Sequence, residues 1–176
     1  MKTMVGIACK LSAAFVLGLV AAGGVNAFEL RGFRGVSWGE GVEALGASTV
    51  AQVVGEVTCY QREHENMLYG NTPLNGVRYC FHKDRLFMVT LDAPVTPKAF
   101  VAEFQRLYGR PDSLRGEAAS WGTKVSGTRA ELASVGHDVT QLKIYSKKIE
   151  PGVAQRMKPL PLAEPPGSVA VRSRSG

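Results

Sequence analysis

The stretch Val77–Leu91 constrains the fold of this chain more than any other segment. Two runs rich in apolar residues lie on either side of the polar residues 82–85. Because side chains alternate along a strand, Val77, Tyr79 and Phe81 would share one face of the first run. The second run is largely apolar on both faces. We therefore expect a β-hairpin whose second strand lies centrally in a sheet and is covered on both sides.

A helix is predicted directly after this hairpin, over Pro97–Tyr108. Thr96 can cap its start, Pro97 suits the first helical position, Gly109 suits the left-handed position after the end, and Pro111 prevents continuation. Four apolar side chains recur at helical spacing and form a stripe that would pack on a sheet. They are Phe100, Phe104, Leu107 and Tyr108.

The remaining segments predict further strands, separated by glycine-rich turns. These strands are 33–39, 49–54, 57–62, 118–125, 128–135 and 139–145. The predicted fold class is therefore α+β: a single domain with a mostly antiparallel sheet of about seven strands, a typical sheet size, and one principal helix packed on it.

The two ends of the chain differ in composition from the middle. Residues 1–27 match a signal peptide, with Lys2 and Lys10 before a short apolar run and the small residues Val25-Asn26-Ala27 at a cleavage site. The apolar run is shorter than the roughly 20 residues of a membrane span. We expect a folded domain over 28–150 and a proline-rich, basic, disordered tail over 151–176.

Most of the formal net charge of +6 belongs to these ends. Residues 28–150 hold 15 basic and 14 acidic side chains, a net charge of +1. A nucleic-acid-binding domain usually concentrates positive charge on its folded body, so nucleic acid is not an expected partner. The preferred interpretation of the basic tail is a solvated, protease-sensitive terminus, and the alternative is contact with an anionic surface such as lipid headgroups or wall polymers. The expected partner of the protein is an envelope protein or an anionic envelope polymer.

Several sequence motifs together resemble a group of small exported bacterial proteins of uncharacterised function. The motifs are FRGVSWG, CYQRE, NTPLNGVRYCFHKDRLFMVTL, LYGRPD and LKIYSKKI, within residues 31–149. The resemblance implies an α+β domain of the cell envelope, and it transfers no catalytic residue to this chain.

Removal of the signal peptide would take away Cys9 and leave Cys59 and Cys80. An even number of cysteines in an oxidising compartment predicts a disulfide, worth about 3 kcal/mol for a loop of about 20 residues. Two buried free thiols are a second possibility. A third is a tetrahedral zinc site made by Cys59, His64, Cys80 and His82, although the spacing matches no compact zinc motif.

No catalytic motif is present: the chain has no Gly-x-Ser-x-Gly, no His-Glu-x-x-His and no phosphate-binding glycine loop. The sequence thus predicts no catalytic residue and no cofactor. We interpret the chain as an exported, non-enzymatic binding or accessory protein of the bacterial envelope, periplasmic or secreted. The alternatives are an envelope metal-binding protein or hydrolase, and an inhibitor or immunity-type protein.

Overall fold

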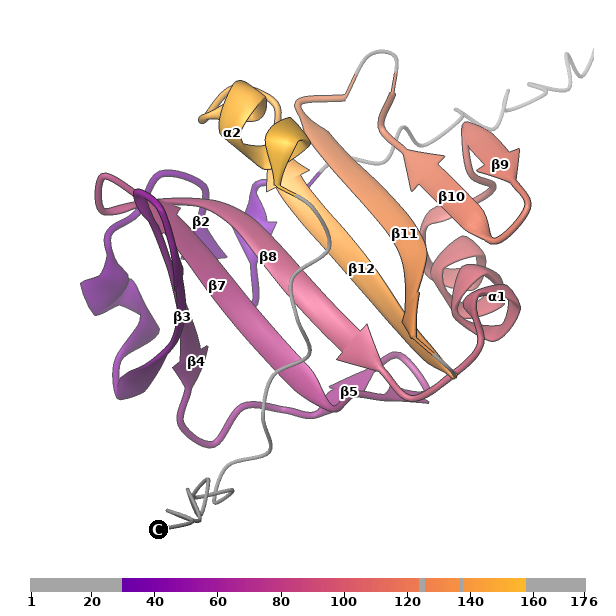
Figure 1. Cartoon of the computed structure of the whole chain (residues 1–176), viewed down its shortest axis with the longest axis horizontal. Coiled ribbons are helices and arrows are strands. Elements are labelled where there is room, and N and C mark those ends of the chain that lie inside the picture. The colour runs from indigo at the N-terminus through magenta and orange to yellow at the C-terminus, as the bar shows by residue number, and fades with distance from the viewer. Residues whose placement is uncertain (1–29, 124–125, 137, 158–176) are drawn as a thin grey trace, which may run out of the picture.

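An eight-stranded sheet forms the centre of the molecule (Figure 1). The computed structural model describes residues 30–123, 126–136 and 138–157. Every neighbouring pair of strands is antiparallel, in the order β3-β4-β7-β8-β12-β11-β10-β9. The strands are β3 Ser48–Val54, β4 Val57–Arg62, β7 Gly76–His82, β8 Arg85–Ala93, β9 Ser113–Arg115, β10 Ala118–Trp121, β11 Thr128–Gly136 and β12 Val139–Ser146. This confirms the predicted α+β fold with a mostly antiparallel sheet.

The central hairpin is formed by β7 and β8, as the sequence predicts. Its two-residue turn, Lys83-Asp84, has φ of 50° and 54°, the positive values that a type I′ hairpin turn requires. β8 pairs with β7 on one side and with β12 on the other. Every residue of the two strands is buried except Arg85 at the start of β8. The expected central position of the second strand is confirmed.

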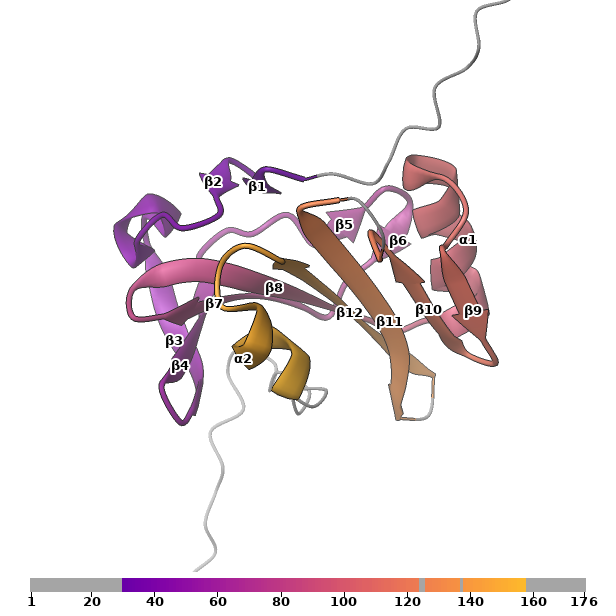
Figure 2. The ribbon, with the colours of Figure 1, turned by 90° about the horizontal axis from the view of Figure 1, so that it is seen from above.

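Helix α1, Pro97–Tyr108, covers one face of the sheet, which we call the α1 face (Figure 2). The Thr96 hydroxyl accepts a hydrogen bond from the Ala99 amide, and Gly109 follows the last turn with φ of 84°. Phe100 and Phe104 are fully buried. The Phe104 ring centroid lies 4.4 Å from that of Trp121 on β10 and thereby joins the helix to the second half of the sheet.

Two small hairpins complete the cover of the α1 face (Figure 2). One joins β1 Gly32–Phe33 to β2 Val36–Ser37, and the other joins β5 Leu68–Tyr69 to β6 Thr72–Pro73. The single strand predicted over 33–39 is therefore wrong. The Arg34-Gly35 pair has φ of 48° and 86°, so the chain reverses there and stays outside the main sheet. A 3₁₀ helix, η1 Val42–Leu45, leads from this hairpin to β3.

The opposite face carries a second helix, α2 Pro151–Arg156 (Figure 2). Its Ala154 is fully buried and belongs to a second apolar cluster. The cluster consists of Val57, Cys59, Cys80, Phe87, Met88, Tyr145 and Ala154. The folded domain thus extends past the predicted boundary at residue 150. Residues 1–27 and 158–176, the predicted signal peptide and the rest of the predicted tail, lie outside the described residues.

Replacement of Phe104 by alanine tests the role of α1. Removal of a fully buried phenylalanine costs about 3–5 kcal/mol, so Phe104→Ala should lower the free energy of unfolding by that amount. Lys98→Ala, on the exposed side of the same helix, should change it little. Chemical denaturation measures both variants. Small and equal effects would mean that α1 contributes little to the core.

Candidate functional site

A pocket of about 490 Å³ opens where β4 and β7 diverge. The two strands pair only from Val57–His82 to Tyr60–Tyr79, and the last two residues of β4 have no partner in β7. The chain between the strands leaves at this point to form the β5–β6 hairpin. The pocket is within the usual size range for small ligands. Its walls are Thr49, Gln61, Arg62, Glu63, His64, Glu65, Met67, Asn75 and Val77.

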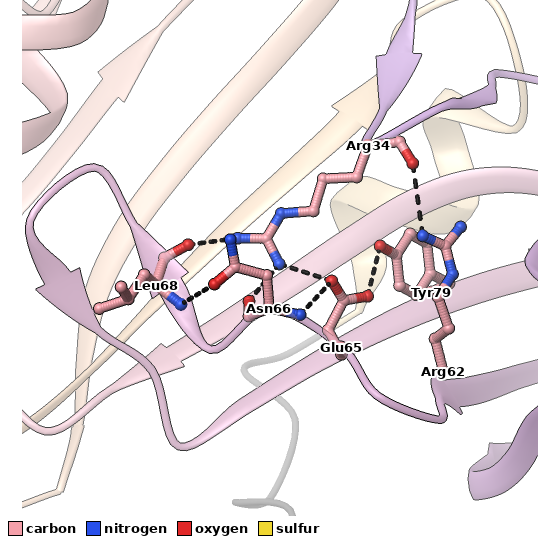
Figure 3. Close-up of polar contacts among 6 residues, drawn as sticks. All are labelled: Arg34, Arg62, Glu65, Asn66, Leu68 and Tyr79. Atoms are coloured by element: carbon pink, nitrogen blue, oxygen red, sulfur yellow. Dashed lines mark hydrogen bonds and ion pairs between the residues drawn. The ribbon is translucent and has the colours of Figure 1, made fainter.

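Arg34 holds the β4–β5 loop beside this pocket (Figure 3). It comes from the turn of the β1–β2 hairpin, and its Nη1 lies 2.7 Å from Glu65 Oε1. The same guanidinium donates to the backbone carbonyls of Asn66 and Leu68. A single arginine thus fixes three successive parts of the loop, through charge-assisted hydrogen bonds that are stronger than neutral ones.

Tyr79 links this loop to the core. Its side chain leaves β7 on the α1 face, and its hydroxyl donates a hydrogen bond of 2.7 Å to Glu65 Oε2. Burial raises the pKa of Tyr79, and the hydrogen bond to Glu65 adds to the effect, so the phenol stays protonated. The Asn66 amide also donates to Glu65. Both oxygens of this carboxylate are therefore bound within the protein.

The guanidinium of Arg62 makes fewer hydrogen bonds than that of Arg34. Its guanidinium carbon lies 5.1 Å from the centre of the Tyr79 ring, in the range of a cation–π contact. Nη1 donates to the Arg34 carbonyl at 3.4 Å, a long hydrogen bond. Nε is buried and has no hydrogen-bond partner among the described residues. Nη2 likewise has no hydrogen-bond partner among them. Leaving a buried donor such as Nε without a partner is costly, so its surroundings need an explanation.

The structure brings together one pair of the predicted site residues. Cys59 and Cys80 lie directly opposite each other on β4 and β7 and form a disulfide. His82 follows on the same face of β7, where its imidazole contacts Glu56 and Glu150. His64 lies instead on the pocket wall, in a left-handed conformation with φ of 54°. Within the described residues, no group of three or more His, Cys, Asp or Glu side chains could hold a metal.

A second polar network lies on the face of the sheet that carries α2, opposite the α1 face. Arg78 Nη2 is 2.7 Å from Asp92 Oδ2, and Arg78 Nε donates to Thr90. Gln141 donates to the other oxygen of Asp92. Burial lowers the pKa of Arg78, while the charge of Asp92 opposes this shift. All four side chains are buried, and their hydrogen bonds tie together the three central strands β7, β8 and β12.

The sequence did not single out the residues of the Arg34 network. The sequence assigns no role to Arg34, Arg62 or Glu65, and it places Tyr79 on one face of a strand without a role for its hydroxyl. One signal was available: a tyrosine on a fully buried face needs a partner for its hydroxyl. The loop between β4 and β5 carries Glu65, but only the fold brings Tyr79 and Arg34 to it.

Comparison of the chain with protein-family models, curated proteins and solved structures gives no match. The resemblance to small exported bacterial proteins therefore stays a prediction. In the part of the chain that the structure describes, no helix combines the length and the apolar composition needed to cross a membrane.

Thiol alkylation under denaturing conditions tests the disulfide. Without reductant, Cys59 and Cys80 should take up no label, because their sulfurs are bonded to each other. Reduction should expose both thiols and lower the free energy of unfolding by about 3 kcal/mol, the value that chain entropy gives for a loop of this length. Immediate labelling of both cysteines in the oxidised protein, with one zinc released per chain, would support the metal site instead.

Proposed function

We propose that this chain is an exported, non-enzymatic binding protein of the bacterial cell envelope, and that its pocket holds the carboxylate of a small ligand. Residues 1–27 support export by their signal-peptide pattern. The Cys59–Cys80 disulfide supports an oxidising compartment, because such bonds are rare where thiols are kept reduced.

The observation that carries the ligand proposal is the unused edge of Arg62. Nε and Nη2 lie on the same edge of the planar guanidinium, whereas Nη1 is directed to the Arg34 carbonyl. Two parallel N–H donors on one edge match the two oxygens of a carboxylate. Arg62 lies on the pocket wall and its ring contact with Tyr79 holds the guanidinium plane in position. A carboxylate bound to this edge would give Nε a partner that the described residues do not supply, and it would accept a second hydrogen bond from Nη2.

The charges around the pocket favour an anion over a cation. Glu65 already accepts hydrogen bonds from Arg34, Tyr79 and the Asn66 amide, so its negative charge is balanced within the protein. Glu63 is exposed to solvent. The other walls offer neutral polar groups on Thr49, Gln61 and Asn75 and apolar surface on Met67 and Val77, which suit the remainder of a small organic acid.

The same contacts favour recognition over catalysis. A general acid or base must be able to exchange a proton with a ligand. Glu65 and Tyr79, the two titratable groups deepest in the network, are bonded to each other, and Glu65 is also bonded to Arg34. Their hydrogen bonds hold the loop in place. The network therefore acts as a rigid support for Arg62.

Calorimetric titration tests the proposal with succinate, galacturonate and N-acetylalanine, each compared with its neutral amide. At least one acid should bind, and its amide should bind much more weakly. Arg62→Gln should weaken the binding about 10- to 100-fold, since hydrogen bonds to a charged group contribute about 1.5–3 kcal/mol. Arg110→Gln removes an equal charge from an exposed site and is the matched control.

Two results would contradict the proposal. Equal affinity of the wild type and Arg62→Gln for an acid would place its carboxylate elsewhere. Equal affinity for an acid and its amide would show that the pocket does not recognise charge. Circular dichroism of both variants checks that the fold is retained.

A further inference from the structure

Strand β3 forms one edge of the main sheet and pairs only with β4. Among the described residues, no strand lies against its outer side. Backbone donors and acceptors along such an edge are free to pair with a strand from another chain, and proteins commonly block them with charges, proline, a β-bulge or a very short strand. Of these devices, β3 has only a bulge, at Ala51. β3 is seven residues long and contains no charged residue, proline or glycine.

The side chains of β3 add apolar surface to this open edge. Val50, Val53 and Val54 are exposed to 59%, 63% and 44%. β-Branched side chains on an exposed strand favour cross-strand packing with a further strand. Edge strands that combine free backbone groups with apolar side chains are sites of strand addition.

The opposite edge of the sheet is protected in the usual way. β9 spans only Ser113–Arg115 and ends on a charged residue. Glu117 follows in the turn to β10. The difference between the two edges indicates that the open character of β3 is a particular feature of that strand.

A β-bulge at Ala51 gives β3 an internal symmetry. Val50 lies opposite Tyr60 and Val53 opposite Thr58, and these two β4 residues are two apart. Val50 and Val53 therefore share one face of the sheet, although they are three residues apart. By the same register, Thr49 and Val54 lie opposite Gln61 and Val57 and share the other face.

We propose that two copies of this chain associate through antiparallel pairing of β3 with β3, about a two-fold axis at the bulge. In this register Val50 lies opposite Val53 of the second copy on one face of the joined sheet. Thr49 lies opposite Val54 of the second copy on the other face. The two eight-stranded sheets then form one continuous sheet.

The internal symmetry of β3 is the reason to assign the edge to a second copy. Two-fold pairing brings each part of a strand against another part of the same sequence. The bulge places matching residues on matching faces, so the apolar pairs form without a shift of register. The strand carries no charge, so no like charges are opposed. The proposal does not depend on the ligand of the pocket.

Sedimentation equilibrium over a series of protein concentrations tests the association. The oxidised protein should form a dimer that dissociates on dilution. Val53→Lys would place an ammonium group in the valine pairs on both sides of the two-fold axis, so this variant should stay monomeric over the same concentrations. Leu114→Lys, the same kind of change at the exposed apolar residue of β9, should dimerise like the wild type.

Amide hydrogen exchange of the wild type supplies a test that needs no variant. Exchange within β3 should become slower as the concentration rises, whereas exchange within β9 should not change. A wild type that is monomeric throughout would overturn the proposal, as would dimerisation of Val53→Lys to the same extent. A monomer whose β3 amides are already protected on dilution would place another occupant on this edge and would equally overturn it.

Discussion

The structure depends on the burial of both faces of the central hairpin β7–β8. A strand covered on both sides needs two separate apolar layers, and the chain supplies them from different regions. On one face, α1 and the two small hairpins pack over Tyr79 and Phe81. On the other, Ala154 of α2 and the Cys59–Cys80 disulfide lie in one apolar cluster with Met88. Each layer is attached to the same two strands, so loss of the hairpin would remove the support of both.

The pocket forms where the pairing of β4 with β7 ends. The disulfide pairs β4 with β7 at Cys59 and Cys80, and the two strands separate one residue pair beyond it. The loop that leaves β4 would be poorly held by itself. Arg34 fixes its backbone and Glu65 from the first hairpin, and Tyr79 anchors Glu65 from the core. Arg62 then rests on the Tyr79 ring at the wall of the opening.

The parts of the fold that the sequence predicted correctly are those with strong local signals. The β7–β8 hairpin has strand alternation, and α1 has a cap, a terminating glycine and an apolar stripe. The parts that it missed depend on tertiary contacts. β9 has only three residues and α2 only six, and α2 is stabilised by burial of Ala154. The 33–39 segment alternates like a strand, but Arg34 and Gly35 adopt positive φ and reverse the chain. The pocket was beyond sequence analysis because Arg34, Arg62 and Tyr79 meet only after folding.

Recognition of a carboxylate by the Nε–Nη2 edge of Arg62 can be followed through the side-chain Nε–H resonance of this arginine. Nitrogen–proton correlation spectra would be recorded while the tightest-binding acid is added to the protein. The Arg62 Nε–H signal should move downfield and saturate together with the binding curve, while the signal of the exposed Arg110 stays in place. An Arg62 signal that does not move as the ligand saturates, or that moves only as much as that of Arg110, would show that Arg62 does not bind the carboxylate.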